Sequence, residues 1–269
     1  MSLLFDASDR PVDFVLHPTD LSEASERTFN HALAIAIRLN WVDFPSVRAR
    51  LAQWKAAGST AGLEESIRQA AVRKVEAPFR DPVAACLDYI ERKPVNMIVL
   101  ATSGRGGISR LIRPPRAEKL AREAKVFTLF VPEGVRGFVS ARTGRVSLRR
   151  ILVPVDPETD PRPAMLQAVR AAELLDDPAL EITLLHVGEG EPSTETDVPD
   201  LPYCKWNVLR RSGPVVEEIL ATADSIRADA IYMSTTWRRA SLTKTEGGVT
   251  ERILANAPCP VATVPVDRP

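Results

Sequence analysis

The sequence predicts an α/β protein made of two parallel-sheet domains in tandem. Apolar runs such as 97–100 and 182–187 are typical of strands that are buried on both faces of a parallel sheet. Segments in which apolar residues lie at helical spacing separate these runs, as in βαβ units. The same order of elements occurs twice within 269 residues, which indicates an internal duplication.

Each half is expected to contain, in order, a strand, a helix, a variable middle, a helix, a strand, a polar loop, a helix and a strand. In the variable middle of the first half, Val47, Leu51 and Trp54 lie at helical spacing. The elements expected in the first half are a strand at 14–16, helices at 24–39 and 45–57, a short strand at 72–75, a helix from Pro82, a strand at 97–100, a helix from Pro114 and a strand at 127–131.

The plan begins again at Arg149, where the strand end VPVD matches the earlier HPTD and a later DAIYMSTT matches NMIVLATS. We therefore expect a first domain at 1–134, a linker hairpin at 135–148 and a second domain at 149–269. The elements expected in the second domain are strands at 151–155, 182–187, 204–209, 230–233 and 261–266 and helices at 163–175, 214–226 and 250–255.

The first half departs from this plan in its middle. Its first helix is followed directly by Trp41-Val42, with no counterpart of the strand at 182–187. The first sheet is therefore expected to lack one strand. The sequence leaves open whether residues 41–70 cover a site in the first half or fill the place of the missing strand.

Composition and charge exclude several classes of function. Lysine plus arginine equals aspartate plus glutamate at 35 each, which argues against a general nucleic-acid binder. No apolar run reaches the roughly 20 residues of a membrane span, and the first residues lack a secretion signal. The odd count of cysteines (Cys86, Cys204, Cys259) disfavours a disulfide framework. We expect packed thiols in a cytoplasmic protein.

A glycine loop lies between the strand at 97–100 and the next helix. Gly104, Gly106 and Gly107 allow a tight turn with unshielded backbone N–H groups. In an open α/β sheet, a loop between a strand end and a helix start is the usual place for a phosphate-bearing ligand. The sequence therefore predicts a candidate site here and at the corresponding place in the second half.

Several stretches resemble one known family. They are the strand ends HPTD and VPVD, the LLHV of 184–187, the loop ATSGRGGISRLI and the tail GGVTERILANAPCPVATVPV. Through them the chain resembles a tandem universal stress protein of the UspA-like family, apart from the linker and residues 41–70. The resemblance implies a Rossmann-like fold of the adenine nucleotide alpha hydrolase type in each half, with the halves paired through their last strands as an intramolecular pseudo-dimer. Many members of that family bind ATP, others bind no nucleotide, and most are not established enzymes.

The ATP loop of that family has glycine, two residues, glycine, nine residues, then glycine and serine or threonine. Neither half of this chain carries the whole pattern, and the two halves lack different parts. The corresponding residues are Ala101, Gly104, Pro114 and Pro115 in the first half and Ser234, Trp237, Gly247 and Gly248 in the second.

The candidate site of the first half contains Asp20, Gly104, Arg105 and Gly107. Arginine suits phosphate oxygens, but Pro114-Pro115 removes two N–H donors where the triphosphate would lie. Each lost bond to a charged group costs on the order of 1.5–3 kcal/mol. The alternatives are a surface glycine turn with solvated arginines and a helix-capping role for Asp20.

In the second half, the resemblance implies that Asp156 lies near the adenosine, Val187 at the adenine, and Gly247, Gly248 and Thr250 near phosphate. A carboxylate can accept hydrogen bonds from ribose hydroxyls, and free N–H groups can donate to phosphate.

Two substitutions weaken this second site. Trp237 stands where the family has a glycine, and Glu246 adds like charge. The alternative makes Asp156 a turn residue before Pro157, and makes Trp237 a plug in a vacated pocket.

The three histidines suggest no catalytic centre. His17 and His186 end predicted strands, but no activated serine or cysteine can be assigned beside them, so we expect packed or turn histidines. His31 is expected to be partly exposed in the middle of its helix. We assign no catalytic or metal-binding residue.

Three functions follow as hypotheses. The first is a cytoplasmic stress-response and regulatory protein with degenerate adenine-nucleotide sites. The second is a protein that binds ATP or ADP, with magnesium, and hydrolyses ATP slowly in one half. The third is an interaction scaffold, in which an edge exposed by the missing strand takes a partner or a second copy as a homodimer.

Overall fold

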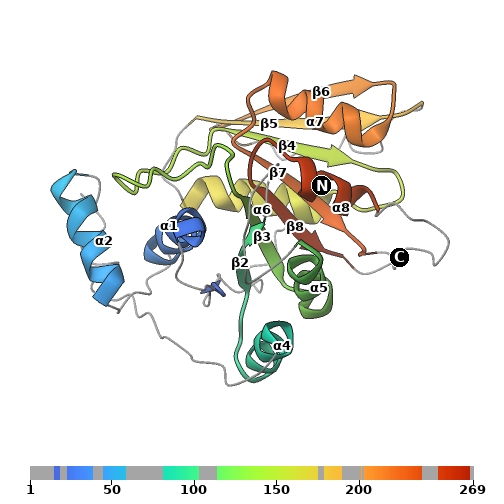
Figure 1. Ribbon diagram of the computed structural model, residues 1–269. Helices are drawn as coiled ribbons and strands as arrows, with labels where there is room; N and C mark the ends of the chain where they lie inside the picture. Colours follow the sequence, from blue (N-terminus) through green and yellow to red (C-terminus); the bar gives the residue numbers. More distant parts are fainter. Residues whose placement is uncertain are drawn as a thin grey trace.

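The computed structural model describes residues 15–18, 23–38, 45–58, 81–102, 114–174, 179–189, 201, 203–237 and 248–266 (Figure 1). The strands are β1 (Val15–Leu16), β2 (Met97–Thr102), β3 (Phe127–Pro132), β4 (Arg150–Val155), β5 (Leu180–Val187), β6 (Cys204–Arg211), β7 (Ala230–Thr235) and β8 (Val261–Pro265). The helices are α1 (Glu23–Arg38), α2 (Pro45–Ala56), α4 (Pro82–Arg92), α5 (Pro114–Ala124), α6 (Arg162–Leu174), α7 (Val215–Ser225) and α8 (Val249–Asn256).

The described strands form one eight-stranded sheet in the order β1-β2-β3-β8-β7-β4-β5-β6. Neighbours within each half are parallel. The predicted α/β class with parallel strands in each half is confirmed. The register follows the apolar runs: in β2, alternate residues point to opposite faces, and all six are buried because helices cover both faces.

The halves meet through their last strands, as the resemblance implied. β3 and β8 pair antiparallel, with Thr128 opposite Thr263 and Phe130 opposite Val261. The Thr263 hydroxyl donates to the carbonyl of Thr128 at 3.4 Å. This ladder turns two parallel sheets into one continuous mixed sheet.

A separate hydrophobic core fills each face of the sheet. One, which we call the α1/α6 core, contains side chains of α1, α2, α6 and the segment 138–148. The other, the α5/α8 core, contains side chains of α4, α5, α7 and α8. Both cores contain residues from both halves, so burial of apolar surface joins the halves as well as the strand ladder does.

The first half has a smaller sheet than the second in the described part of the chain. Between α1 and α4 the described residues form helix α2, where the second half has β5 and β6. This agrees with the expectation of a reduced first sheet. The short strand expected at 72–75 lies outside the described residues.

Helix α2 packs against the segment that connects the halves. The Trp54 side chain is 2% exposed, and its indole N–H donates to the carbonyl of Ala141 at 3.0 Å. The segment itself turns back at Gly144, with an antiparallel bridge between Val139 and Val146. The helix predicted at 45–57 therefore covers the connecting segment.

The prediction that His31 is partly exposed is wrong, because the same segment covers it. The His31 side chain is fully buried, and its ring meets that of Phe138 edge to face at 4.6 Å. Its Nδ1 lies 2.8 Å from the Arg27 carbonyl, and the Phe138 N–H donates to its Nε2 at 3.2 Å. Burial lowers the pKa of His31 to about 4, so the neutral ring is the form that accepts this bond.

Two glycines offer a matched test of the Trp54 contact. Gly144 and Gly134 have φ of 69° and 75°, so alanine meets similar backbone strain at either place, about 1 kcal/mol. A Cβ at Gly144 would lie 2.2 Å from the Trp54 ring, whereas at Gly134 it would meet nothing within 4 Å. Gly144→Ala should therefore lower the unfolding free energy by about 2 kcal/mol more than Gly134→Ala. Urea denaturation measures both, and equal losses would contradict this packing.

Candidate functional site

The candidate site of the second half lies at the carboxyl edge of its sheet. β4 ends at Val155, which is opposite His186 near the end of β5. The β4–β7 register, with Ile151 opposite Ala230, places the end of β7 at this same edge. Open parallel sheets bind ligands at this edge. The structure therefore brings Asp156, Val187 and Trp237, which follows β7, to one side of the molecule.

Asp156 is used by its own turn. Its Oδ1 accepts the Glu158 N–H at 2.9 Å, and its Oδ2 lies 3.5 Å from the Thr159 hydroxyl. The Thr159 N–H donates to the Asp156 carbonyl at 3.1 Å. This is the geometry of an Asx turn, and it supports the turn-forming alternative for this exposed carboxylate. Val187 is half-buried and packs against the α5/α8 core.

The end of β7 is tied to the start of α8. The Thr235 hydroxyl accepts the N–H of Trp237 at 3.2 Å and lies 3.2 Å from the Thr250 hydroxyl. The indole of Trp237 packs against the α5/α8 core. Its φ of 43° is in the left-handed region that favours glycine. The backbone thus keeps the conformation expected of the glycine that the resemblance placed here, while the side chain fills space.

A carboxylate stands at the amino end of α8. Gly248 is the N-cap of this helix, and no side chain caps it. A Cβ at Gly248 would lie 2.8 Å from Glu251 Oε2. Glu251 is in the first turn, where the helix dipole favours a negative charge. A phosphate that approached this helix start would meet that carboxylate.

Sequence reasoning did not single out Glu251. The available signal was its position three residues after the N-cap, where a glutamate commonly folds back over the start of a helix.

Glu118 of α5 is a second acidic side chain, and it interacts with Glu251. Burial, and then the charge of Glu251, raises the pKa of the half-buried Glu118 carboxyl to about 7, while Arg122 opposes the shift. The two acids come from opposite halves of the chain. Their charges interact because the β3–β8 ladder places α5 and α8 on the same face of the sheet.

His186 is an orphaned polar group at the same edge. Its side chain is 4% exposed, and neither ring nitrogen has a hydrogen-bond partner in the described part of the chain. His17 follows β1 in the first half, and its Nδ1 lies 3.0 Å from the Val99 carbonyl. Burial lowers the pKa of His17. Both histidines are packed at strand ends.

The site of the first half is defined by one described feature. Helix α5 begins at Pro114, which is followed by Pro115, so two consecutive positions at its start have no N–H to donate. The predicted site residues Asp20, Gly104, Arg105 and Gly107 lie outside the described residues, as does Gly247 of the second half.

The sequence matches the family model of the universal stress proteins over residues 13–132 and 201–265, which together make up more than half of the chain. This chain belongs to the universal stress protein family. Its two matched segments lie in opposite halves, in agreement with a tandem repeat. No curated protein is a significant match.

Solved structures of this family share the fold. A universal stress protein from Archaeoglobus fulgidus DSM 4304 superposes with a TM-score of 0.59 at 20% identity, covering 94% of this chain and 95% of that one. A putative universal stress protein from Pseudomonas aeruginosa UCBPP-PA14 gives 0.56 at 16% identity, with 93% and 91% covered. The fold of this chain is therefore shared over nearly the full length of both structures.

Two further properties of the described residues concern membrane-spanning helices and metal ligands. None of the described helices combines the length and apolar character needed to cross a bilayer. Within the same residues, no three histidine, cysteine or acidic side chains are grouped as a metal site would require. The three thiols are packed, and burial raises the pKa of Cys259 to about 12.

The Glu118 carboxyl should make stability depend on pH. In the unfolded chain it loses its proton near pH 4.5, whereas in the folded chain it keeps it to about pH 7. The folded state thus binds more protons in this window, and the unfolding free energy falls as pH rises from 4.5 to 7. Glu118→Gln should remove about 1 kcal/mol of that fall, because solvent screens this half-buried group.

Urea denaturation at pH 5 and pH 7.5 measures this effect. Glu123→Gln, an exposed change on the same helix, is the control and should keep the wild-type pH dependence. An unchanged pH dependence in Glu118→Gln would show that Glu118 titrates normally.

Proposed function

We propose that this universal stress protein is a regulatory, cytoplasmic member of its family whose adenine-nucleotide sites are degenerate, and that it acts through its conformation and partners. The observation that carries the proposal is the Glu251 carboxylate beside Gly248 at the start of α8. In this reading residues 1–134 and 149–269 are two domains joined by the linker 135–148.

The residues present at the carboxyl edge do not fit ATP well. A phosphate oxygen about 4 Å from a carboxylate would be repelled by roughly 4 kcal/mol at an effective dielectric constant of 20. That energy corresponds to about three orders of magnitude in Kd. The helix dipole and free N–H groups at the start of α8 favour phosphate. The Glu251 carboxylate, however, already lies at that helix start and interacts with the dipole.

Trp237 opposes a nucleotide for a steric reason. Its ring lies against the α5/α8 core, with which Val187 also packs. A glycine in this left-handed conformation would leave that space open. Asp156 adds to the misfit, since both of its carboxylate oxygens already lie near groups of its own turn.

Both halves therefore oppose a triphosphate, by different means. In the first half the helix start lacks donors because it is made of prolines, and in the second it carries a resident negative charge. The chemistry left to the protein is recognition rather than catalysis. A partner would bind to the surface formed by the joined sheet and the helices that cover it.

Calorimetry with Mg-ATP tests the proposal. We expect no binding at unit stoichiometry with a Kd below about 100 µM in the wild type, because of the repulsion from Glu251. Glu251→Gln removes the charge and should tighten binding at least tenfold. Glu91→Gln, an equal charge change at an exposed position on α4, should have no effect. Micromolar binding of Mg-ATP by the wild type would overturn the proposal.

A further inference from the structure

A hollow lies at the amino edge of the second-half sheet, opposite the carboxyl edge that carries the candidate nucleotide site. Its volume is about 680 Å³, and it is formed by the amino ends of β4, β5, β6 and β7 together with the connecting segment. β4 separates it from the carboxyl edge by six residues, or about 20 Å of strand. It is therefore distinct from the candidate nucleotide site.

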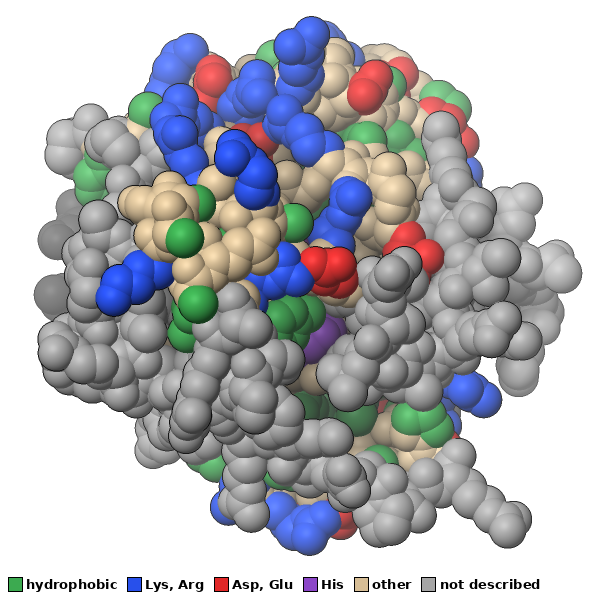
Figure 2. Space-filling view, turned by 60° about the vertical axis from the view of Figure 1, so that its left-hand side comes forward, with side chains coloured by type: hydrophobic (Ala, Val, Ile, Leu, Met, Phe, Trp, Pro, Cys, Tyr) green, Lys and Arg blue, Asp and Glu red, His purple; other side chains and the backbone are tan. Residues whose placement is uncertain are grey.

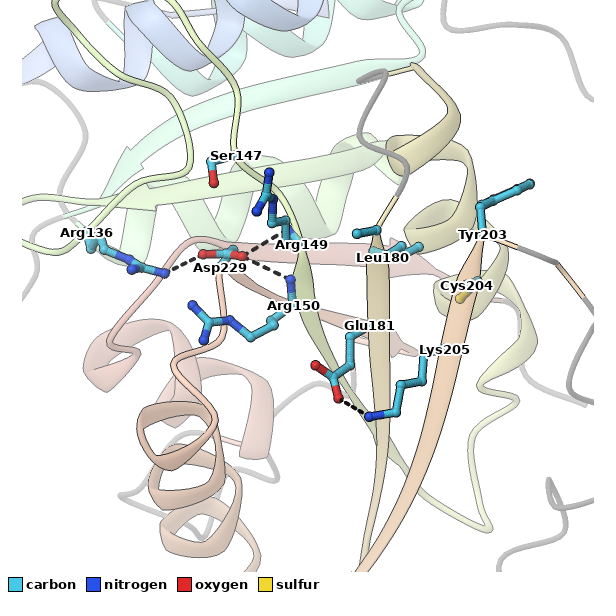
Figure 3. Close-up of a pocket in the computed structure, with 11 residues that line it drawn as sticks. Arg136, Ser147, Arg149, Arg150, Leu180, Glu181, Tyr203, Cys204, Lys205 and Asp229 are labelled. Atoms are coloured by element: carbon cyan, nitrogen blue, oxygen red, sulfur yellow. Dashed lines mark hydrogen bonds and ion pairs between the residues drawn. The ribbon is translucent and has the colours of Figure 1, made fainter.

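Asp229, at the entrance to β7, holds the wall of this hollow together. The side chain is only 5% exposed, and its Oδ2 accepts the backbone N–H groups of Arg149 and Arg150, each at 2.9 Å. Its Oδ1 forms an ion pair with the guanidinium of Arg136 (Figure 3). Both carboxylate oxygens of Asp229 are thus paired with donors of the protein itself.

The second acid of the hollow is also engaged. Glu181 accepts hydrogen bonds from Asn207 at 2.6 Å and from the Lys205 ammonium at 3.1 Å. These bonds, that of Asn207 first, lower the pKa of the Glu181 carboxyl. Glu181 therefore stays ionised but is already satisfied by polar neighbours.

The hollow has more basic than acidic side chains. Arg136, Arg149, Arg150 and Lys205 line it, against Asp229 and Glu181. In the described part of the chain, the guanidinium of Arg150 makes no hydrogen bond or ion pair, although its charge helps to lower the pKa of the Glu181 carboxyl. Figure 3 shows the guanidinium of Arg136 directed at Asp229, with the side chains of Arg149 and Arg150 extending to opposite sides of that carboxylate. Two net positive charges remain at a concave site.

The surrounding surface has the same sign. The amino ends of β4, β5 and β6 point to the left in Figure 1, the side that comes forward in Figure 2. There, Lys and Arg side chains gather over the upper part of the face. A basic surface around a basic hollow raises the local concentration of anions.

We propose that this hollow binds a small phosphate-bearing molecule with at least two negative charges. Guanidinium groups match phosphate oxygens in geometry and charge, and the volume is within the range of small-molecule sites. Leu180 and Cys204 supply an apolar part of the lining. Because Arg136 belongs to the connecting segment and Arg150 to β4, a bound anion would hold these two parts together. This proposal does not depend on the proposed function.

Inorganic pyrophosphate is the probe, added to the full chain in a calorimeter. We expect one site with a submillimolar Kd. Arg150→Ala should weaken it at least tenfold, since it removes the guanidinium but keeps the backbone N–H to Asp229. Arg92→Ala, an exposed arginine of α4, is the control for charge alone and should bind as the wild type does.

Folding of each variant is checked by its melting temperature. If Arg150→Ala melts early, Lys205→Ala replaces it, because in the described part of the chain the Lys205 ammonium forms an ion pair with Glu181 alone. No binding by the wild type, or equal weakening by Arg92→Ala, would overturn the proposal. Equal affinity in the wild type and a folded Arg150→Ala would overturn it as well.

Discussion

The antiparallel ladder between β3 and β8 is the constraint on which the rest of the structure depends. It is buried: Thr128 and Thr263, which face each other across it, are almost inaccessible to solvent. Backbone groups in such a place must pair with one another, because no water can replace a missing partner. Separating the halves would expose both strands and open both cores, so the repeat is a single folding unit in energetic terms.

The ladder also explains how a reduced first half remains stable. Three described strands alone would leave a small sheet with little covered surface. Here the first-half strands continue into five from the second half, and the connecting segment fills the α1/α6 core with Phe138, Val139, Val146 and Leu148. Helix α2 then seals that segment through Trp54. In the second half, β5 and β6 bury apolar surface. In the first half, the linker and α2 provide part of that burial instead.

The sequence was most informative where burial dictates composition. β2 and β5 were predicted because a strand covered on both faces must be apolar throughout, and helices such as α5 because one face must be apolar. The ladder itself came from the family resemblance, since no local pattern encodes which strands meet. His31 was misjudged because its burial depends on Phe138, 107 residues away. Helical spacing carries no information about such a distant partner.

The polar sites were harder still, because they depend on side-chain direction. Glu251 and Asp229 look like ordinary acids in the sequence, yet one folds over a helix start and the other gathers three donors from two distant segments. The loops 103–113 and 238–247, where much of the nucleotide pattern lies, are outside the described residues. The sequence predicted at which edge of the sheet the candidate site lies. It did not predict which side-chain contacts form there.

The two edges of the second-half sheet now have opposite electrostatic character. At the carboxyl edge, the Glu251 carboxylate stands at the helix start, so an incoming anion meets negative charge there. Burial, and then the charge of Glu251, raises the pKa of the neighbouring Glu118. At the amino edge, arginines outnumber the acids, and those acids are already satisfied by internal hydrogen bonds. Coulomb interactions of this size act over several ångströms in a concave, partly desolvated site. A chain of zero net charge can therefore repel an anion at one end of a strand and attract it at the other, because the position of its charges, and not their sum, decides where an anion binds.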